Sequence, residues 1–251
     1  MTNKHLSHSE MLQLKRVNTP TIYNGWEQIT KRDAAKECFN LEETHDFMPE
    51  KGPMIGRAVT VQIKPSDREY LDNNRSAMGD YYEYVSKIEG PKIMVVQDLD
   101  KPKTYGSFWG EVNANVHRQM GCVGAIIDGA IRDVDEMKNA GFKALAQRLC
   151  IGHACAYPMN WGEPVEVFGC EVKTGQLIHA DKHGFIVIPE EDESQILEAS
   201  MLMDQYECET VIQTARSNNC TDYIRFIEQI RAAGKEFNSK AQEKFNHGGE
   251  W

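Results

Sequence analysis

The stretch GAIIDGAIRDVDE, residues 124–136, gives the clearest signal of the fold. Apart from Asp128, the part before Arg132 is small or branched and apolar, which is typical of a β-strand buried on both faces. The strand ends in Arg132 and Asp133, a cation followed directly by an anion. In open α/β folds, ligands collect where the carboxyl ends of strands meet loops. The pair predicts either a surface ion pair or a site for a small charged substrate and a metal ion.

The segments around this stretch alternate between strand and helix. KIMVVQDLD (92–100) reads as a buried strand, 107–121 as a helix that stops at a glycine, and 123–131 as the next strand. This spacing is that of a βαβ crossover. Further strands are expected at 55–63, 142–148, 164–172, 177–181 and 185–189. The predicted fold class is therefore mixed α/β.

Three regions are expected along the chain: an N-terminal helical extension at 1–50, a central α/β domain at 51–190 and a C-terminal helical extension at 191–251. Within the central domain, 67–90 predicts one helix. In the C-terminal region, 222–237 places isoleucines three apart, as an amphipathic helix requires. The tail from Asn238 onward is expected to fray or to dock on a neighbouring subunit.

Composition excludes several classes of protein. The formal charge is −10, with 28 Lys and Arg against 38 Asp and Glu, which argues against nucleic acid as a partner. No apolar run approaches the ~20 residues needed to cross a membrane. The seven cysteines form no CxxC pair, and the N-terminus lacks the apolar core of a secretory signal. We expect a cytoplasmic protein with reduced thiols.

A second acid is expected beside the Arg132–Asp133 pair. One helix and one strand separate Glu111, in WGEVNA (109–114), from Arg132, so the crossover returns both residues to the same edge of the sheet. A guanidinium grips a carboxylate or an enolate oxygen with paired donors. Mg²⁺ keeps several waters and uses one or two protein carboxylates. The arrangement suits a divalent metal and an anionic substrate.

Four ordered blocks of the sequence carry a family resemblance: 52–67, 90–100, 109–136 and 163–189. With these glycine-containing blocks the chain resembles the RraA-like proteins, which include divalent-metal-dependent 4-hydroxy-4-methyl-2-oxoglutarate aldolases. The resemblance covers roughly residues 20 to 190. It implies a swivelling β/β/α domain with a layered α-β-β-α core, to which the terminal helices are additions, and assembly as a homotrimer or homohexamer.

The resemblance also implies a role for each matching position. Arg132 corresponds to the arginine that contacts substrate and stabilises the pyruvate enolate, and Asp133 corresponds to the direct ligand of Mg²⁺ or Mn²⁺. Glu111 stands where the aldolases usually have aspartate, an acid that holds metal-bound water. The backbone N–H groups around Gly110, Glu111, Val112 and Asn113 would bind the substrate carboxylate at a helix start.

The implied activity is a retro-aldol cleavage of a 4-hydroxy-2-oxo acid to pyruvate, with oxaloacetate decarboxylation as a side activity. The alternative is a non-catalytic protein that binds and regulates the RNA-degradation machinery, because such relatives also keep an Arg-Asp pair. Glu136 favours the enzyme, since aldolase-like members carry an acid there. In the aldolases a neighbouring subunit supplies a further acid, for which Glu190, Glu191 and Glu193 are candidates by location only.

Other titratable residues favour structural roles. His179 and His183 have the spacing of a helical metal pair, but they flank a turn, where that spacing has no meaning. Asp181 matches a family position in a tight turn, and His153 near Cys155 lacks a third ligand. Asp128 lies in the strand that leads to Arg132. Two roles are open for it: positioning Arg132, or packing within the strand without contact to Arg132.

Overall fold

The computed structural model describes residues 5–217 and 222–245. Its strands are β1 (His45–Asp46), β2 (Met54–Ile63), β3 (Lys92–Asp98), β4 (Ser107–Trp109), β5 (Cys122–Ile131), β6 (Lys143–Leu149), β7 (Pro158–Trp161), β8 (Val165–Val167), β9 (Cys170–Val172), β10 (Leu177–Asp181) and β11 (Gly184–Ile188). Its helices are α1 (His8–Leu14), α2 (Thr19–Glu27), α3 (Arg68–Asn73), α4 (Ala77–Lys87), α5 (Glu111–Gln119), α6 (Val134–Asn139), α7 (Glu193–Glu207), α8 (Gln213–Ser217) and α9 (Tyr223–Phe245), with a 3₁₀ turn at Pro49–Lys51 and a π-helical segment at Cys208–Ile212.

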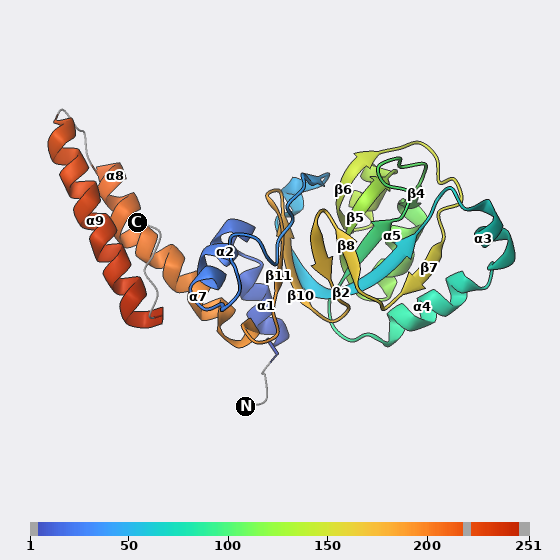
Figure 1. Ribbon diagram of the computed structural model, residues 1–251, viewed down its shortest axis with the longest axis horizontal. Coiled ribbons are helices and arrows are strands. Elements are labelled where there is room, and N and C mark those ends of the chain that lie inside the picture. Colours follow the sequence, from blue (N-terminus) through green and yellow to red (C-terminus); the bar gives the residue numbers. More distant parts are fainter. Residues whose placement is uncertain (1–4, 218–221, 246–251) are drawn as a thin grey trace.

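One strongly curved, nearly closed sheet dominates the fold, with strand order β1-β6-β5-β3-β2-β10-β11 (Figure 1). The pairs β2–β3, β3–β5 and β5–β6 are parallel, as the predicted crossover requires. In contrast, β10 pairs antiparallel with both β2 and β11. The central strands are thus connected through helices, while the outer strands form a hairpin.

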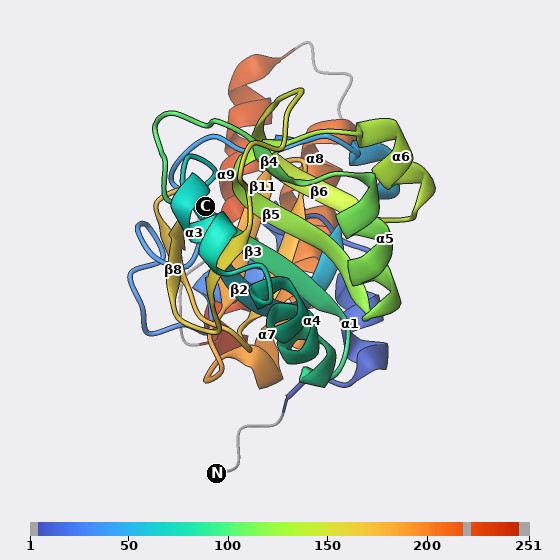
Figure 2. The ribbon, with the colours of Figure 1, turned by 90° about the vertical axis from the view of Figure 1, so that its right-hand side faces the viewer.

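The strand β5 is buried along nearly its whole length, because its side chains alternate between two cores. Ala125 and Ile127 pack in a core covered by α4, α5 and α6, whereas Ile126 faces a second core with Val167 and Phe185 from the outer strands. Figure 2 shows α4 and α5 lying in front of the parallel strands. This double burial explains the continuous apolar run in the sequence.

A third core completes the layers. It lies between the β10–β11 hairpin and the helices α1, α2 and α7, where Trp26, Ile186 and Ile196 are fully or almost fully buried. From one side to the other, the layers are helices, parallel strands, the outer strands and helices again. The expected α-β-β-α layering and mixed α/β class are confirmed.

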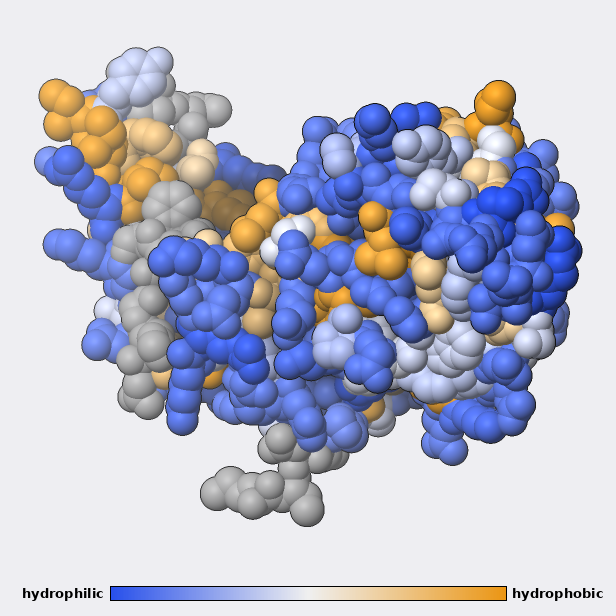
Figure 3. Space-filling model, turned by 45° about the vertical axis from the view of Figure 1, so that its right-hand side comes forward, coloured by the Kyte–Doolittle hydropathy of each residue, from blue (hydrophilic) through white to orange (hydrophobic). Residues whose placement is uncertain are grey.

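The last part of α7 and the helices after it form an arm that extends away from these layers (Figure 1). Met203, Val211 and Phe237 pack within this arm. Hydrophobic side chains gather at its outer end (Figure 3), and α9 exposes Ile224 by 75%. No helix among the described residues is long and apolar enough to cross a membrane.

Several expected elements differ in detail. The predicted helix 67–90 is two helices, α3 and α4, and the predicted strand 164–172 is the β8–β9 hairpin, which turns at Phe168 and Gly169 with positive φ. In the region 1–50, expected to be helical, the described α-helices are α1 and α2, the second of which ends at Glu27; β1 and the start of the 3₁₀ turn follow. The predicted fraying from Asn238 is wrong as far as Phe245, because α9 continues to that residue; residues 246–251 lie outside the described part.

Candidate functional site

Arg132 and Asp133 follow directly after the last residue of β5. The backbone N–H of Arg132 donates to the carbonyl of Trp109 at 3.1 Å, which ties this turn to the end of β4. Asp133 takes the left-handed conformation, with φ of 53°, and precedes α6. Aspartate tolerates this conformation better than most residues. The two side chains thus emerge at the carboxyl end of the parallel strands.

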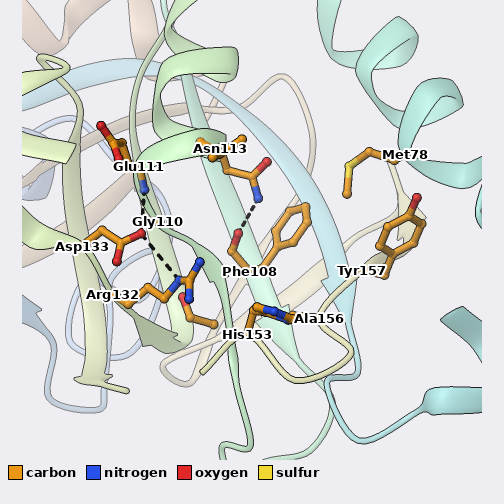
Figure 4. Close-up of a pocket in the computed structure, with 12 residues that line it drawn as sticks. Met78, Phe108, Gly110, Glu111, Asn113, Arg132, Asp133, His153, Ala156 and Tyr157 are labelled. Atoms are coloured by element: carbon orange, nitrogen blue, oxygen red, sulfur yellow. Dashed lines mark hydrogen bonds and ion pairs between the residues drawn. The ribbon is translucent and has the colours of Figure 1, made fainter. Parts of the chain in front are cut away.

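The start of α5 meets this turn at Gly110 and Glu111. The Glu111 N–H donates to Asp133 Oδ2 at 3.1 Å, and Arg132 Nε lies 3.5 Å from the same oxygen (Figure 4). A Cβ atom on Gly110 would lie 2.5 Å from Asp133 Oδ2, so any larger residue would push the carboxylate away. The glycine therefore permits the close approach of helix and carboxylate.

These residues line a pocket of about 200 Å³. All six residues proposed from the sequence line it, namely Gly110, Glu111, Val112, Asn113, Arg132 and Asp133. The structure brings them together because β4 pairs with β5 in parallel, so that the ends of both strands reach one edge. Arg132 and Asp133 are each about a third exposed.

The side-chain amide of Asn113 is hydrogen-bonded to the wall of the pocket. Its amide nitrogen donates to the carbonyl of Phe108, and its amide oxygen accepts from the hydroxyl of Tyr82 at 3.0 Å. Because these bonds occupy the amide, the N–H at the helix start is the group left to bind an anion.

His117 anchors α5 behind the site. It is fully buried, with Nδ1 2.7 Å from the carbonyl oxygen of Asn113 and Nε2 2.8 Å from the hydroxyl of Tyr81 on α4. Burial lowers the pKa of His117 to about 4, although the bond with Asn113 acts the other way. A neutral histidine therefore joins α4 to α5 at neutral pH.

Sequence reasoning missed the rest of the pocket. Also lining it are Met78 at the start of α4, Ser107 and Phe108 in β4, and His153, Ala156 and Tyr157 in the loop after β6. The parallel pairing of β6 with β5 brings that loop to the same edge. A prediction from the sequence that β6 pairs with β5 in parallel would have pointed to this loop. No sequence pattern indicates that Met78 lines the pocket.

The residues present fit a metal held largely through water. No group of three or more His, Cys, Asp and Glu residues able to bind a metal occurs in the described part of the chain, so a closed zinc site is not formed there. Mg²⁺ needs only one or two protein carboxylates. Asp133 and Glu111 supply two acids in the same pocket.

The histidines of the β10–β11 hairpin have structural roles. His179 is buried, its Nδ1 lies 3.0 Å from the Thr19 hydroxyl, and desolvation lowers its pKa to about 4. His183 pairs with Asp181, whose other carboxylate oxygen accepts from the Thr19 N–H at 2.9 Å. The hairpin is thereby fixed to α2, in agreement with the structural interpretation.

Three further acids have partners within the chain. Asp128 accepts from Lys101 Nζ at 2.7 Å and from the Phe168 N–H at 3.0 Å, so it holds the β8–β9 turn rather than Arg132. Glu191 pairs with Arg32, and Glu193 pairs with Arg57.

A family model described as RraA-like, Aldolase/RraA, matches residues 19–187. The chain therefore belongs to the RraA-like family. The match spans nearly the whole sheet and the whole candidate site, and it leaves out α1, α7 and the helices after α7.

Individual relatives are distant. A protein of Halalkalibacterium halodurans named putative 4-hydroxy-4-methyl-2-oxoglutarate aldolase is 26% identical over 167 residues, 66% of this chain and 74% of that protein. Protein DlpA of Legionella pneumophila is 22% identical over 180 residues, 71% of this chain, and the match spans 27% of DlpA. This chain thus corresponds to about a quarter of DlpA.

The fold has a counterpart among solved structures. Streptomyces coelicolor RraAS2, described as an unusual member of the RNase ES inhibitor RraA protein family, is similar with a TM-score of 0.64 and 20% identity, over 81% of this chain and 96% of that chain. At this identity the likeness concerns the fold.

Proposed function

We propose that the protein is a divalent-metal-dependent lyase that cleaves a 4-hydroxy-2-oxo acid, such as 4-hydroxy-4-methyl-2-oxoglutarate, and releases pyruvate. The observation that carries the proposal is that Arg132, Asp133 and the start of α5 at Glu111 line one pocket at the end of β5. The name of the Halalkalibacterium relative supports the same class of reaction.

The start of α5 binds the substrate carboxylate in this proposal. The first N–H groups of a helix have no partner within it and favour anions. Asp133 already occupies the Glu111 N–H, which leaves those of Val112 and Asn113. Arg132 and Asn113 line the same pocket (Figure 4). The 2-oxo acid is thereby oriented with its keto oxygen toward the guanidinium and the Asp133 carboxylate.

Arg132 stabilises the charge that develops as the C3–C4 bond breaks. Its N–H groups donate to the enolate oxygen, and preorganised charge of this kind often contributes more to catalysis than any other effect. Mg²⁺ or Mn²⁺, held by Asp133 and by water on Glu111, supplies Lewis-acid polarisation of the keto oxygen when bound. Glu111 holds the water that accepts the proton of the 4-hydroxyl. Oxaloacetate decarboxylation passes through the same enolate and is the expected side activity.

A second candidate function is a non-catalytic protein that regulates RNA degradation by binding its enzymes. The fold shared with RraAS2, a member of an RNase ES inhibitor family, favours it. The two functions differ in their dependence on Asp133. Metal-dependent turnover requires its carboxylate, whereas binding to another protein requires no turnover.

The proposal includes a homotrimer or homohexamer, as the family resemblance implies, and a cytoplasmic location, as the cysteine pattern suggests. Light scattering on the purified protein measures the assembly. A mass of three or six times 28.5 kDa supports the proposal, and a monomer contradicts this part of it.

The deciding experiment measures pyruvate release by coupling to NADH oxidation with lactate dehydrogenase. The substrates are 4-hydroxy-4-methyl-2-oxoglutarate and oxaloacetate, each with Mg²⁺, Mn²⁺ or EDTA. We expect pyruvate that depends on the metal and disappears with EDTA. A folded protein that releases no pyruvate from either substrate with either metal contradicts the lyase and favours the regulator.

A further inference from the structure

The pocket has two chemically different ends. Arg132, Asp133 and Glu111 lie at one end, whereas Met78 and Tyr157 lie at the other, with Phe108 between them and the polar residues (Figure 4). The two ends come from different parts of the fold, since Met78 belongs to α4 and Tyr157 precedes β7. A substrate that spans the pocket therefore meets charge at one end and apolar surface at the other.

The apolar end offers no fixed positive charge. Among the described residues that line the pocket, Arg132 and His153 are the only side chains that can be cationic. Arg75 approaches the apolar end only with its backbone carbonyl, which accepts from the Tyr157 hydroxyl at 2.7 Å. Its guanidinium is 72% exposed and pairs with Asp72. A carboxylate placed at this end would meet no cationic partner there, whereas an apolar group would contact apolar side chains.

The apolar wall is held in place by contacts that use up its polar groups. The Tyr157 hydroxyl is engaged by Arg75, and the Phe108 carbonyl accepts from the Asn113 amide. The Phe108 ring packs edge-on against Trp109 at 5.2 Å between centroids. Met78 adds a flexible thioether that adapts to the shape of an apolar group. The wall is thus preorganised to bind hydrocarbon.

His153 lies between the two ends, next to Arg132 and Ala156 (Figure 4). Its Nδ1 lies 2.8 Å from the carbonyl oxygen of Ala154, which fixes the ring. The loop is tied to β4 by a bond of 3.0 Å from the Ser107 N–H to the Gly152 carbonyl. Within the described lining of the pocket, His153 is therefore the only residue near the apolar end that can gain a positive charge.

We infer that the leaving half of the substrate is uncharged and apolar, so that the preferred 4-hydroxy-2-oxo acid carries a short alkyl group on C4 in place of a carboxylate. This inference rests on the proposed function and narrows it, because 4-hydroxy-4-methyl-2-oxoglutarate, whose leaving half is a second, charged pyruvate, then becomes the poorer kind of substrate. In the reaction the C3–C4 bond breaks, the 4-hydroxyl loses its proton, C3 gains one, and the products are pyruvate and an aldehyde.

A matched pair of substrates tests the inference on the full-length protein with Mg²⁺. 4-Hydroxy-2-oxohexanoate carries an ethyl group where 4-hydroxy-2-oxoglutarate carries a carboxylate of similar size. We expect kcat/KM for the hexanoate to be at least about tenfold higher, the discrimination typical of an apolar pocket. A preference for the glutarate overturns the inference.

Variants of the wall give a second readout, the ratio of kcat/KM for the two substrates. Met78→Lys places a cation at the apolar end and should shift the ratio toward the glutarate, whereas Met78→Leu should keep the order. His153→Gln should also keep the order, because the apolar wall and not His153 sets it. An unchanged ratio in Met78→Lys, or a reversed order in His153→Gln, overturns the assignment of the wall.

Oxaloacetate separates failure of the inference from failure of the proposed function. Decarboxylation of oxaloacetate needs only the end of the pocket that contains Arg132, because the leaving group is CO₂. Metal-dependent decarboxylation with a preference for the glutarate leaves the lyase standing and removes the apolar specificity. No pyruvate from all three substrates removes both.

Discussion

Two of the arginine–carboxylate pairs in the described part of the chain differ in almost every physical respect. Arg57 and Glu193 are 15% and 1% exposed and form a two-point contact, with 2.7 Å between Arg57 Nη1 and Glu193 Oε2. Glu193 also accepts from the Leu6 N–H at 2.7 Å. Arg132 and Asp133 are 35% and 34% exposed, and a single contact of 3.5 Å joins them.

The difference shows how a structural ion pair is told apart from a candidate site. A buried pair is stable only when its hydrogen bonds are satisfied, and Glu193 meets that condition by linking the N-terminus, β2 and α7. The Arg132–Asp133 pair leaves most of its donors and acceptors open toward a pocket. The sequence showed a cation beside an anion only in the second case, because Arg57 and Glu193 are far apart along the chain.

Asp133→Asn should have the largest effect. Asparagine keeps the size of the side chain and tolerates the left-handed backbone, so the fold is retained while the metal-binding charge is lost. Metal-dependent pyruvate release should fall by about a thousandfold or more, equivalent to ~4 kcal/mol. Full turnover in this variant would mean that Asp133 only caps α5.

Glu193→Gln should destabilise the protein without touching the chemistry. Leaving Arg57 buried without its partner costs about 3–5 kcal/mol of unfolding free energy. Urea unfolding measures the loss, and turnover per folded molecule should stay as in the wild type. The matched control is Glu191→Gln, whose exposed pair with Arg32 should be worth less than about 1 kcal/mol. Equal losses of unfolding free energy in both variants would contradict the claim that the buried pair of Glu193 stabilises the fold more than the exposed pair of Glu191.

Arg132→Lys should lower kcat/KM by about a hundredfold, since a point charge cannot reproduce two parallel donors. The unfolding free energy should change little, because the pair with Asp133 is partly open to solvent. Steady-state kinetics on both proposed substrates measures the effect. Unchanged kinetics would place Arg132 outside the reaction.

The smallest effect concerns pH and the wall behind the site. The folded pKa of His117, about 4, lies below its usual 6.5, so protons bind the unfolded chain first. The contribution of neutral His117 to the free energy of unfolding is fully present above pH 6.5. It is lost as the pH falls toward 4, at about 1.4 kcal/mol per pH unit. Unfolding at pH 7.5 and pH 5 should show a loss of ~2 kcal/mol more in the wild type than in His117→Gln. Parallel pH profiles would contradict this.

Two other buried groups with shifted pKa values, His179 and Asp98, also affect the pH dependence of stability, and His117→Gln leaves both in place. His179 behaves as His117 does, with a pKa of about 4. Asp98 acts in the opposite direction, since desolvation raises its pKa to about 6 and the folded state then gains protons first. The difference between the two proteins therefore isolates the contribution of His117.

The fold could be predicted where burial leaves a simple pattern. The apolar run before Arg132 marks β5 because both of its faces are covered. The β8–β9 turn was missed because Phe168 and Gly169 interrupt an otherwise apolar stretch through backbone conformation alone. The break between α3 and α4 was missed for a similar reason, since local polarity continues across it.

The candidate site could be predicted in part. Glu111, Arg132 and Asp133 follow from the crossover, because parallel strands bring their carboxyl ends together. Met78 and Tyr157 depend on tertiary packing between segments that share no local pattern. The polar end was therefore predictable, and the apolar end was not.

The most direct test of the central claim is Mn²⁺ binding, followed by electron paramagnetic resonance with and without oxalate, a planar dianion shaped like the pyruvate enolate. We predict that the wild type binds Mn²⁺ and that oxalate tightens the binding. We predict further that Asp133→Asn loses both effects, while Glu193→Gln keeps them. Mn²⁺ binding that persists in Asp133→Asn, or none in the wild type, would contradict the claim that Arg132–Asp133 forms a metal-assisted site.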